Sequence, residues 1–468
     1  MAAETSALTA HEDERLDESD FVGAEVEGSK VRAGWNRVVG SWDAHRNSDE
    51  PQQVVGYLEG LKGLIAFEAF LWVFMRTIVP GAVFESLSEN ASPPRYQSVL
   101  REVFSPLFWD GNLQASFFVI ISARLVCLRF LRAKTPVSMA GTLFRRGIRL
   151  WFPTAVALMI VTVINHSDGF EAITHNAEIL GNHIPEVPYK IPNAWAYFNS
   201  VFNLFWYITG TQAGVKAFPT GMLWIVPIVY QQSFTVYMVM LMFPYTTKDS
   251  RVWGLVGFIV CAWWVESWAW YSMTGLLFAE IVTNMNFIEY AKNGVALPKT
   301  QKRLSYYWVA GFFLAVGVIL KYVYEDAFPN AVNDELIVHT PIYGGGLNRD
   351  YDINQPHQRV SSWFVIVGAL LFIELNSFAQ KLLANPVSRY FGRISFSWFL
   401  TQSAIIYTVG LQLNLRLQHI DHWTPPLAQF VTFLACLITT VACADVYTRL
   451  VDNPSKWLAD WLFAWIQR

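Results

Sequence analysis

The segment from Tyr57 to Val79 reads YLEGLKGLIAFEAFLWVFMRTIV, which is apolar enough and long enough to cross a bilayer. Four charged side chains interrupt it, namely Glu59, Lys62, Glu68 and Arg76. A charge at mid-membrane costs about 3 kcal/mol on insertion scales, so such residues usually face a polar cavity or a partner. The segment therefore predicts a membrane span that borders a polar interior.

The composition extends this prediction to the rest of the chain. Hydrophobic residues make up 53% of the 468 residues and charged residues only 15%, which is too little charge to cover a soluble protein of this size. Such a composition is typical of polytopic helical membrane proteins. The cysteines lie inside apolar runs without metal-ligand spacing, so we expect buried thiols, no disulfide framework and no metal site. These cysteines are Cys127, Cys261, Cys436 and Cys443.

Ten apolar runs are candidate membrane spans. They lie near residues 63–80, 113–131, 149–166, 222–244, 253–271, 273–291, 306–324, 361–379, 394–412 and 427–446. The fifth and sixth form one aromatic-rich block, in which residues 271–275 are the expected turn. A cytosolic N-terminus places the loops rich in Lys and Arg on the cytosolic side, as the positive-inside rule requires. We therefore predict an all-α membrane helix bundle of about ten transmembrane helices, with both termini cytosolic, in an endomembrane or the plasma membrane.

The ends of the chain differ from the apolar region. Residues 1–30 carry nine acidic side chains and few large apolar ones, so residues 1–56 are expected to form a disordered cytosolic tail rather than a cleaved signal peptide. The membrane domain is expected over residues 57–460, and a short cytosolic end over residues 461–468. Glycosylation sequons at Asn90 and Asn165 fall on the predicted non-cytosolic side, which is weak support for this topology.

Four short motifs follow one another on the predicted spans. They read LEGLKG at 58–63, FWDGN followed by SFFVIISAR within 108–124, RRGIRLWFP at 145–153 and FGRISFS at 391–397. In this order they resemble the D-G-L-R-G, F-F-V-L-S-G, R-R-x-x-R-I-x-P and L-G-x-I-S-Y-S elements of the acyltransferase 3 family of membrane acyltransferases, in its fungal branch. The resemblance covers about residues 55–460.

The resemblance implies transfer of an acyl group, usually acetyl, from acyl-CoA to a hydroxyl. Acyl-CoA is then a co-substrate, and no bound cofactor is expected. The aromatic content favours a hydroxylated hydrophobic small molecule or a lipid as acceptor, as in secondary-metabolite biosynthesis. Membrane lipids are further partners, and no nucleic-acid partner is expected. The alternative is a non-catalytic relative that acts as a membrane carrier or binding protein.

The chain departs from the family at two polar positions. Relatives place an arginine in the opening motif and a histidine eleven residues later, and these positions hold Lys62 and Val73 here. A carboxylate position on the fourth span, within LWIVPIVY at 223–230, holds Val229. Valine cannot accept a proton, so the general base of an acyl transfer has to come from another position.

Glu68 is the nearest carboxylate on the first span and our first candidate base. It lies five residues before Val73, about 140° around a helix, so the two do not face the same side. The alternative is a structural pair of Glu68 with Arg76 or with Arg124. His166, at the mouth of the third span, is the second candidate, for an acceptor that enters from the non-cytosolic side.

Cations for the phosphates of CoA are expected at the cytosolic face. Arg145, Arg146 and Arg149 mark the entry to the third span, and 145 and 149 share one helix side. With Lys62 they are a candidate grip for the pyrophosphate and 3′-phosphate. The alternative is that these arginines only anchor the end of the span.

Two further features carry alternatives. The remaining intramembrane acids are either functional groups or structural pairs. They are Glu266, Glu280, Glu374 and Asp445. The aromatic segment AWAYFNSVFNLFWY at 194–207 is too short to span and predicts an interfacial or re-entrant helix, either a lid or a lipid anchor.

Overall fold

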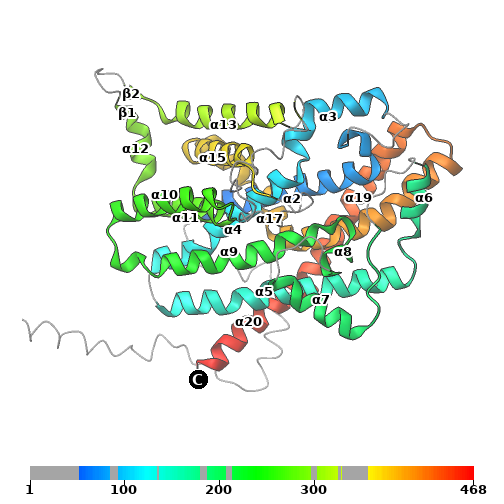
Figure 1. Ribbon diagram of the computed structural model, residues 1–468, viewed down its shortest axis with the longest axis horizontal. Coiled ribbons are helices and arrows are strands. Elements are labelled where there is room, and N and C mark those ends of the chain that lie inside the picture. Colours follow the sequence, from blue (N-terminus) through cyan, green and yellow to red (C-terminus); the bar gives the residue numbers. More distant parts are fainter. Residues whose placement is uncertain are drawn as a thin grey trace, which may run out of the picture. The chain divides into compact units, whose positions relative to one another are not determined.

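The computed structural model describes residues 52–84, 93–133, 136–179, 187–206, 213–296, 303–324, 328 and 357–467. These residues form helices and their connections (Figure 1), apart from one short antiparallel pair of strands, β1 (Val295–Ala296) and β2 (Arg303–Leu304). Most of the predicted acidic tail and the sequon at Asn90 lie outside the described residues.

Each of the ten predicted spans overlaps one helix. These helices are α2 (Gln52–Ile78), α4 (Gly111–Ala133), α5 (Pro136–His166), α9 (Ile225–Met240), α10 (Lys248–Trp264), α11 (Ala269–Asn284), α13 (Tyr306–Tyr322), α15 (Val360–Leu375), α17 (Pro386–Ile405) and α19 (Pro425–Tyr447). The shorter α-helices are α3 (Arg95–Phe108), α6 (Glu171–Ile179), α7 (Ala194–Trp206), α8 (Ala213–Lys216), α12 (Phe287–Asn293), α16 (Ser377–Leu383), α18 (Leu411–Leu415) and α20 (Asn453–Ile466). Single turns of 3₁₀ helix are η2 (Pro80–Ala82), η3 (Pro219–Trp224) and η4 (Phe243–Tyr245), and π-helical turns are η7 (Ile406–Gly410), η8 (Arg416–Ile420) and η9 (Thr448–Asp452).

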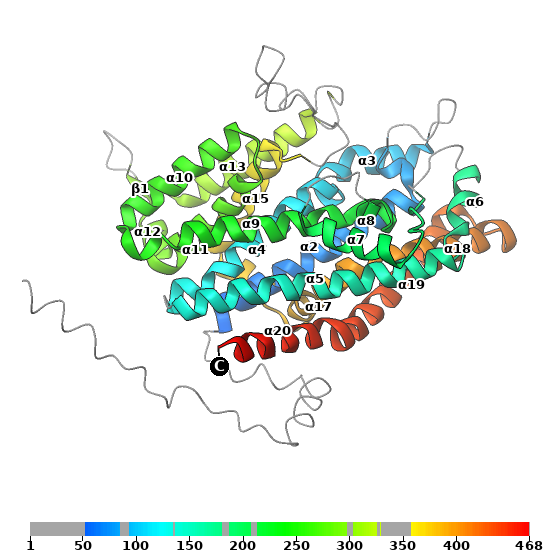
Figure 2. The same ribbon diagram turned by 60° about the horizontal axis from the view of Figure 1, so that its bottom comes forward.

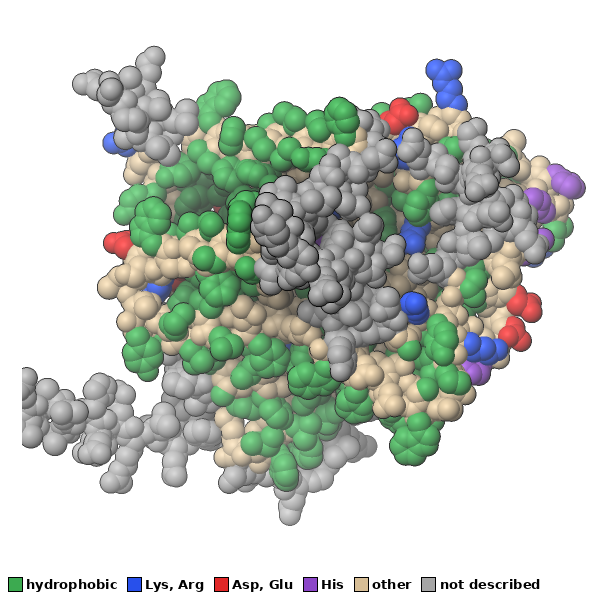
Figure 3. Space-filling model, viewed as in Figure 1, with side chains coloured by type: hydrophobic (Ala, Val, Ile, Leu, Met, Phe, Trp, Pro, Cys, Tyr) green, Lys and Arg blue, Asp and Glu red, His purple; other side chains and the backbone are tan. Residues whose placement is uncertain are grey.

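Within the described residues, five continuous helical stretches are long and apolar enough to cross a membrane. They are Arg95–Leu128, Met139–His166, Pro219–Tyr245, Pro386–Ile420 and Pro425–Ile466. A sixth is added if α15 and α16 count as one bent span. α2, the first predicted span, is not among these stretches, so the count of ten spans stays a prediction. The chain is therefore a helical membrane protein by the length and composition of its helices. Figure 3 agrees, because hydrophobic side chains are spread over the described part of the visible face and most charged ones lie toward its left and right sides.

The helices pack in pairs that are distant in sequence. α2 packs along α17 and also contacts α4, while α4 packs on α11 and α9. α13 lies beside α15, and α20 lies beside α5, in both views of the ribbon (Figures 1 and 2). The helix α2, which contains the apolar segment from Tyr57 onward, therefore lies between helices from both halves of the described chain.

Glycines allow α2 and α17 to touch through their backbones. A Cβ atom on Gly63 would overlap the carbonyl oxygen of Ser388, and one on Gly392 would overlap the carbonyl oxygen of Glu59. Small residues at such positions are typical of close helix packing in membranes. This contact joins the opening motif to the late motif.

The expected turn at residues 271–275 is wrong. The fifth and sixth predicted spans are separate helices, but the break lies at residues 265–268, where Glu266 adopts a φ of 53°. Residues 271–275 are helical within α11. Gly275 lies there because a Cβ atom would overlap the carbonyl oxygen of Ile120 in α4, so this glycine serves close packing rather than a turn.

The predicted span at 361–379 is also interrupted. α15 ends at Leu375, and α16 leaves at 102° to it. The bend is stabilised by Asn376, whose side chain accepts hydrogen bonds from the backbone N–H groups of Phe378 and Ala379 and so caps α16. Asn376, a single polar residue inside an apolar run, therefore marks the end of α15 and the start of α16.

Three smaller expectations have different outcomes. The aromatic segment forms the helix α7, whose Trp195 and Trp206 are 81% and 71% exposed. The expectation that all cysteines are buried is wrong, because Cys261 and Cys443 are exposed. A helix surface that faces lipid has no need to hide an apolar thiol from solvent. α20 runs across residue 460, the predicted limit of the membrane domain.

Candidate functional site

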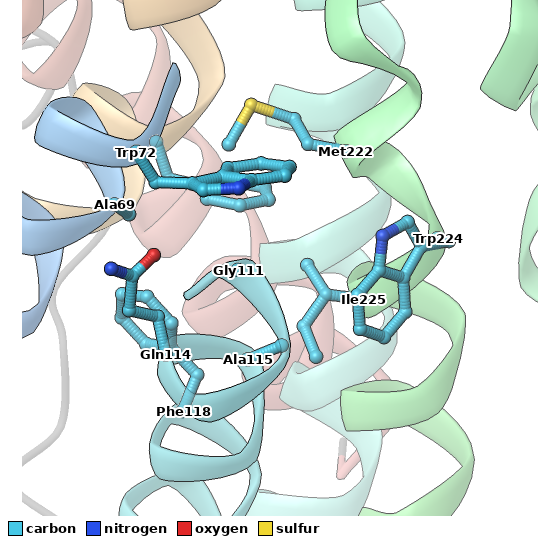
Figure 4. Close-up of a pocket in the computed structure, with 10 residues that line it drawn as sticks. Ala69, Trp72, Gly111, Gln114, Ala115, Phe118, Met222, Trp224 and Ile225 are labelled. Atoms are coloured by element: carbon cyan, nitrogen blue, oxygen red, sulfur yellow. The ribbon is translucent and has the colours of Figure 1, made fainter. Parts of the chain in front are cut away.

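A pocket opens between α2, α4, α17 and the junction of η3 with α9 (Figure 4). The cavity itself is small, about 20 Å³, and about 300 Å³ of space lies between its walls when open solvent is included. Its walls are mainly apolar and include Trp72, Phe118, Met222, Trp224, Ile225 and Phe399. The pocket therefore lies where the first two motifs, the fourth span and the late motif come together.

The second motif, FWDGN, builds one wall by starting α4. The Asp110 carboxylate accepts hydrogen bonds from the backbone N–H groups of Asn112 (2.9 Å) and Leu113 (3.3 Å), which caps the helix. Asp110 also forms an ion pair with Lys321 of α13. Gly111 lies against the indole of Trp72, where a Cβ atom would come within 2.6 Å of the ring. The glycine therefore lets α2 and the start of α4 enclose the pocket from two sides.

The opposite wall follows an irregular turn. Thr220 and Gly221 have φ values of 63° and 62°, and α9 begins a few residues later. A left-handed conformation is uncommon and strained for threonine. This turn presents Met222, Trp224 and Ile225 to the pocket.

Glu68 lies on α2 one turn before Trp72, so the two share a side of the helix. Glu68 makes no ion pair within the described residues. Its expected structural partners are engaged elsewhere: Arg124 pairs with Glu374, and the Arg76 guanidinium lies 5.5 Å from the ring of Trp72. The alternative in which Glu68 pairs with either arginine is therefore wrong.

The two positions that are polar in relatives have aliphatic surroundings in the structure. Val73 is fully buried in the hydrophobic core, and Val229 packs against that core. Neither position carries a group that transfers protons. Glu68 precedes the lining residue Ala69 on α2 but does not itself line the pocket.

Charged side chains from several helices gather around Lys62, in the N-terminal half of α2. Lys62 interacts electrostatically with Glu59, Lys456, Arg149 and Asp452, so three cations and two carboxylates surround this position, and Lys456 forms an ion pair with Asp452. The sequence predicted Lys62 and Arg149 together but missed Lys456. An isolated lysine 394 positions from Lys62 in the sequence carries no spacing signal.

Arg146 is held inside the bundle. Its Nε donates to Ser233 Oγ at 3.0 Å and its Nη2 to Ser122 Oγ at 2.5 Å, which links α5 to α9 and α4. These bonds position its guanidinium, and they also give it a structural role.

Arg145 forms its contacts with α20. Its Nε lies 2.8 Å from the Asp460 carboxylate, and its guanidinium stacks 4.9 Å from the ring centre of Phe463. Arg149, by contrast, is exposed. Positions 145 and 149 lie one turn apart on α5, as expected, but Arg145 is already paired with Asp460 of α20.

His166 lies at the exposed end of α5. Its Nδ1 is 2.9 Å from the carbonyl oxygen of Thr162, and His166 does not line the pocket. The sequon at Asn165 is also engaged, because the Asn165 amide donates to the carbonyl oxygen of Pro188 at 3.0 Å. The structure therefore does not bring the second candidate base together with Glu68.

The other intramembrane acids mostly form ion pairs. Glu280 lies 2.7 Å from Arg251, Glu374 lies 2.6 Å from Arg124, and Asp445 lies 2.9 Å from Arg449. Glu266 occupies the turn between α10 and α11. These contacts favour the structural alternative for the three paired acids. Within the described part of the chain, no group of three metal-ligating side chains comes together.

Comparison with family models, curated proteins and solved structures finds no match. The resemblance to acyltransferases therefore rests on the four motifs. What the structure adds is their arrangement: a cationic cluster, a carboxylate and an apolar pocket follow one another along α2.

Proposed function

We propose that the protein is a membrane O-acyltransferase that moves an acyl group, acetyl in the first instance, from acyl-CoA to a hydroxyl of a hydrophobic molecule. The observation that carries the proposal is the order of groups along α2. Lys62, Glu68 and Trp72 follow one another at about 9 Å and then about 6 Å, at 1.5 Å per residue.

The cationic cluster suits the phosphates of CoA. Lys62, Arg149 and Lys456 lie together, and Arg146 is held nearby by two serines. Anionic phosphates are stabilised by such groups, and an exposed Arg149 offers a planar fork for bidentate contact. In the proposed topology of ten spans with cytosolic termini, this cluster faces the cytosol, where acyl-CoA is made.

Glu68 supplies the base in this proposal. It takes the proton of the acceptor hydroxyl while the hydroxyl oxygen attacks the thioester carbonyl. The carbon–sulfur bond breaks, and the CoA thiolate leaves and takes up a proton. The products are an ester and CoA. Among the described residues no arginine pairs with Glu68, so none of them holds it as a permanent anion, and such a carboxylate fits this role.

The pocket suits the acceptor. Its aromatic and aliphatic walls favour an apolar body, which agrees with an acceptor that partitions into the membrane. The two wall residues on α2, Ala69 and Trp72, lie within about one turn of Glu68. We therefore place the acceptor hydroxyl near Trp72, within reach of the Glu68 carboxylate.

Turnover by purified protein tests the proposal. Protein in lipid nanodiscs is incubated with acetyl-CoA and a lipid extract, and free CoA and acetylated products are measured by mass spectrometry. We expect Glu68→Gln to abolish turnover while acetyl-CoA binding and thermal unfolding stay unchanged. Glu102→Gln, at an exposed carboxylate of α3, is the control and should keep turnover. Normal turnover by Glu68→Gln would remove Glu68 as the base.

A non-catalytic carrier is the second candidate. It is favoured by the aliphatic Val73 and Val229 at positions where relatives are polar. Retained binding of acetyl-CoA or of a hydrophobic alcohol, with no CoA released under any condition, would support it over the enzyme.

A further inference from the structure

One polar atom points into the apolar pocket without a partner. Gln114 lies in the first turn of α4, lines the pocket and is 2% exposed. Its Oε1 is buried and accepts no hydrogen bond from the described residues. A buried amide oxygen without a donor carries a desolvation cost, so such an atom needs an explanation.

The orientation of this amide is determined by its nitrogen. Nε2 donates to the carbonyl oxygen of Glu68 at 3.0 Å and to that of Phe108 at 3.1 Å. Both N–H bonds are thus used, and both partners are pure acceptors. A flipped amide would place Oε1 against two carbonyl oxygens, so the observed orientation is the stable one. Figure 4 shows the oxygen on the side of Trp72 and the nitrogen turned away.

The pocket therefore combines apolar walls with one fixed acceptor. We propose that it binds a neutral molecule with an apolar body and a hydroxyl group, and that Gln114 positions this hydroxyl by accepting its hydrogen bond. A carboxylate or phosphate has no proton to donate and would meet a partial negative charge, so anions are excluded. The inference deepens the proposed function, on which it rests for the role of this ligand as acyl acceptor.

Gln114 also fixes where the hydroxyl lies relative to α2. The same amide bonds the Glu68 backbone and the end of α3, so its Oε1 cannot move without breaking two hydrogen bonds. A hydroxyl held at Oε1 therefore stays beside the turn of α2 that contains Glu68 and Trp72. Gln114 is in this sense a positioning residue, because it holds the ligand and exchanges no proton.

A matched pair of ligands tests the inference without acyl-CoA. Benzyl alcohol and benzyl methyl ether have similar apolar bodies, and only the alcohol donates a hydrogen bond. Binding to wild-type protein in nanodiscs is measured by calorimetry and corrected for partition into empty nanodiscs. We expect the alcohol to bind about fivefold more tightly, the worth of one hydrogen bond. Equal affinities, or no binding of either ligand, would overturn the inference.

Variants locate the preference. Gln114→Met keeps the length of the side chain and should reduce the preference for the alcohol to about onefold. Gln97→Met, at another buried glutamine outside the pocket, should keep it. A preference that survives Gln114→Met would contradict the assignment. If that variant fails to fold, Ala115→Leu fills the pocket and should abolish binding of both ligands, whereas unchanged binding would place the ligand elsewhere.

The outcomes separate this inference from the proposed function. Preference for the alcohol with no acyl transfer supports the pocket and contradicts the enzyme. Acyl transfer whose KM for the acceptor is the same in wild type and Gln114→Met supports the enzyme and contradicts the role of Gln114.

Discussion

Arg124 and Glu374 form an ion pair of 2.6 Å between α4 and α15, and each side chain is only 1% exposed. Tyr57 of α2 joins them, because its hydroxyl donates to Glu374 at 2.6 Å and accepts from Arg124 at 2.9 Å. Three helices therefore meet at one buried polar group. A charge pair in such a place stabilises the assembly only while both partners are present.

Removal of one charge should destabilise the bundle. We expect Glu374→Gln to lower the free energy of unfolding by about 3–5 kcal/mol, because Arg124 is left buried without a counter-charge. Chemical unfolding in mild detergent measures this. The double variant R124M/E374Q should recover most of the loss. A single variant as stable as wild type would show that the pair is solvated in the membrane-embedded protein.

The glycine contact between α2 and α17 should be intolerant of a methyl group. We expect Gly63→Ala to lower the free energy of unfolding by about 1–3 kcal/mol, since its Cβ atom meets α17 backbone that cannot move aside cheaply. Gly257 of α10 has no atom within 4 Å of an added Cβ and is the matched control. Gly257→Ala should be neutral or more stable by up to about 1 kcal/mol. Equal effects of the two changes would contradict the close packing.

Arg149 allows the cationic cluster to be tested without damage to the fold. Because this side chain is exposed, Arg149→Ala should leave thermal unfolding unchanged. We expect the apparent KM for acetyl-CoA to rise about tenfold with little change in kcat, as for loss of one charge-assisted contact. Lys248→Ala, at an exposed lysine of α10, should have no effect. An unchanged KM in Arg149→Ala would place the CoA phosphates elsewhere.

The proposed topology is tested by labelling single cysteines. In a variant with Cys261 and Cys443 replaced by serine, Lys248→Cys should react with a membrane-impermeant maleimide from the cytosolic side of sealed vesicles. His422→Cys should react only after the vesicles are opened, because its loop is predicted to be non-cytosolic. The reverse pattern would contradict cytosolic termini.

The positions of the helices could be predicted from the sequence, because hydropathy sets where a chain can enter a membrane. Their ends were harder to predict. The break after α10 lies at Glu266, inside an aromatic block that contains no proline or glycine at that point. The bend after α15 depends on Asn376, and one asparagine in an apolar run signals a cap only once its hydrogen bonds are known.

The candidate site was predictable only in part. Lys62, Glu68 and Arg149 could be chosen because each is a charge in or beside a span. The sequence analysis missed Gln114. An uncharged residue at the start of a predicted span has no large free-energy cost of burial, so nothing marks it as a functional residue. Its signal is the pair of backbone acceptors at Glu68 and Phe108, which are contacts of the folded chain. The diversion of Arg145 depends on Asp460, more than 300 positions later, and no local pattern reveals it.

The hydrogen bond between Tyr57 and Glu374 joins residues 317 positions apart. At about 5–20 residues per second, the ribosome needs roughly 15–60 s to synthesise the chain between them. During this time α2 is already made, while its hydrogen-bond partner on α15 and its packing partner α17 do not yet exist. The helix α2 therefore has to persist with incomplete polar contacts while the rest of the chain is synthesised. Closure of the bundle around α2 is a late event in the biogenesis of this protein.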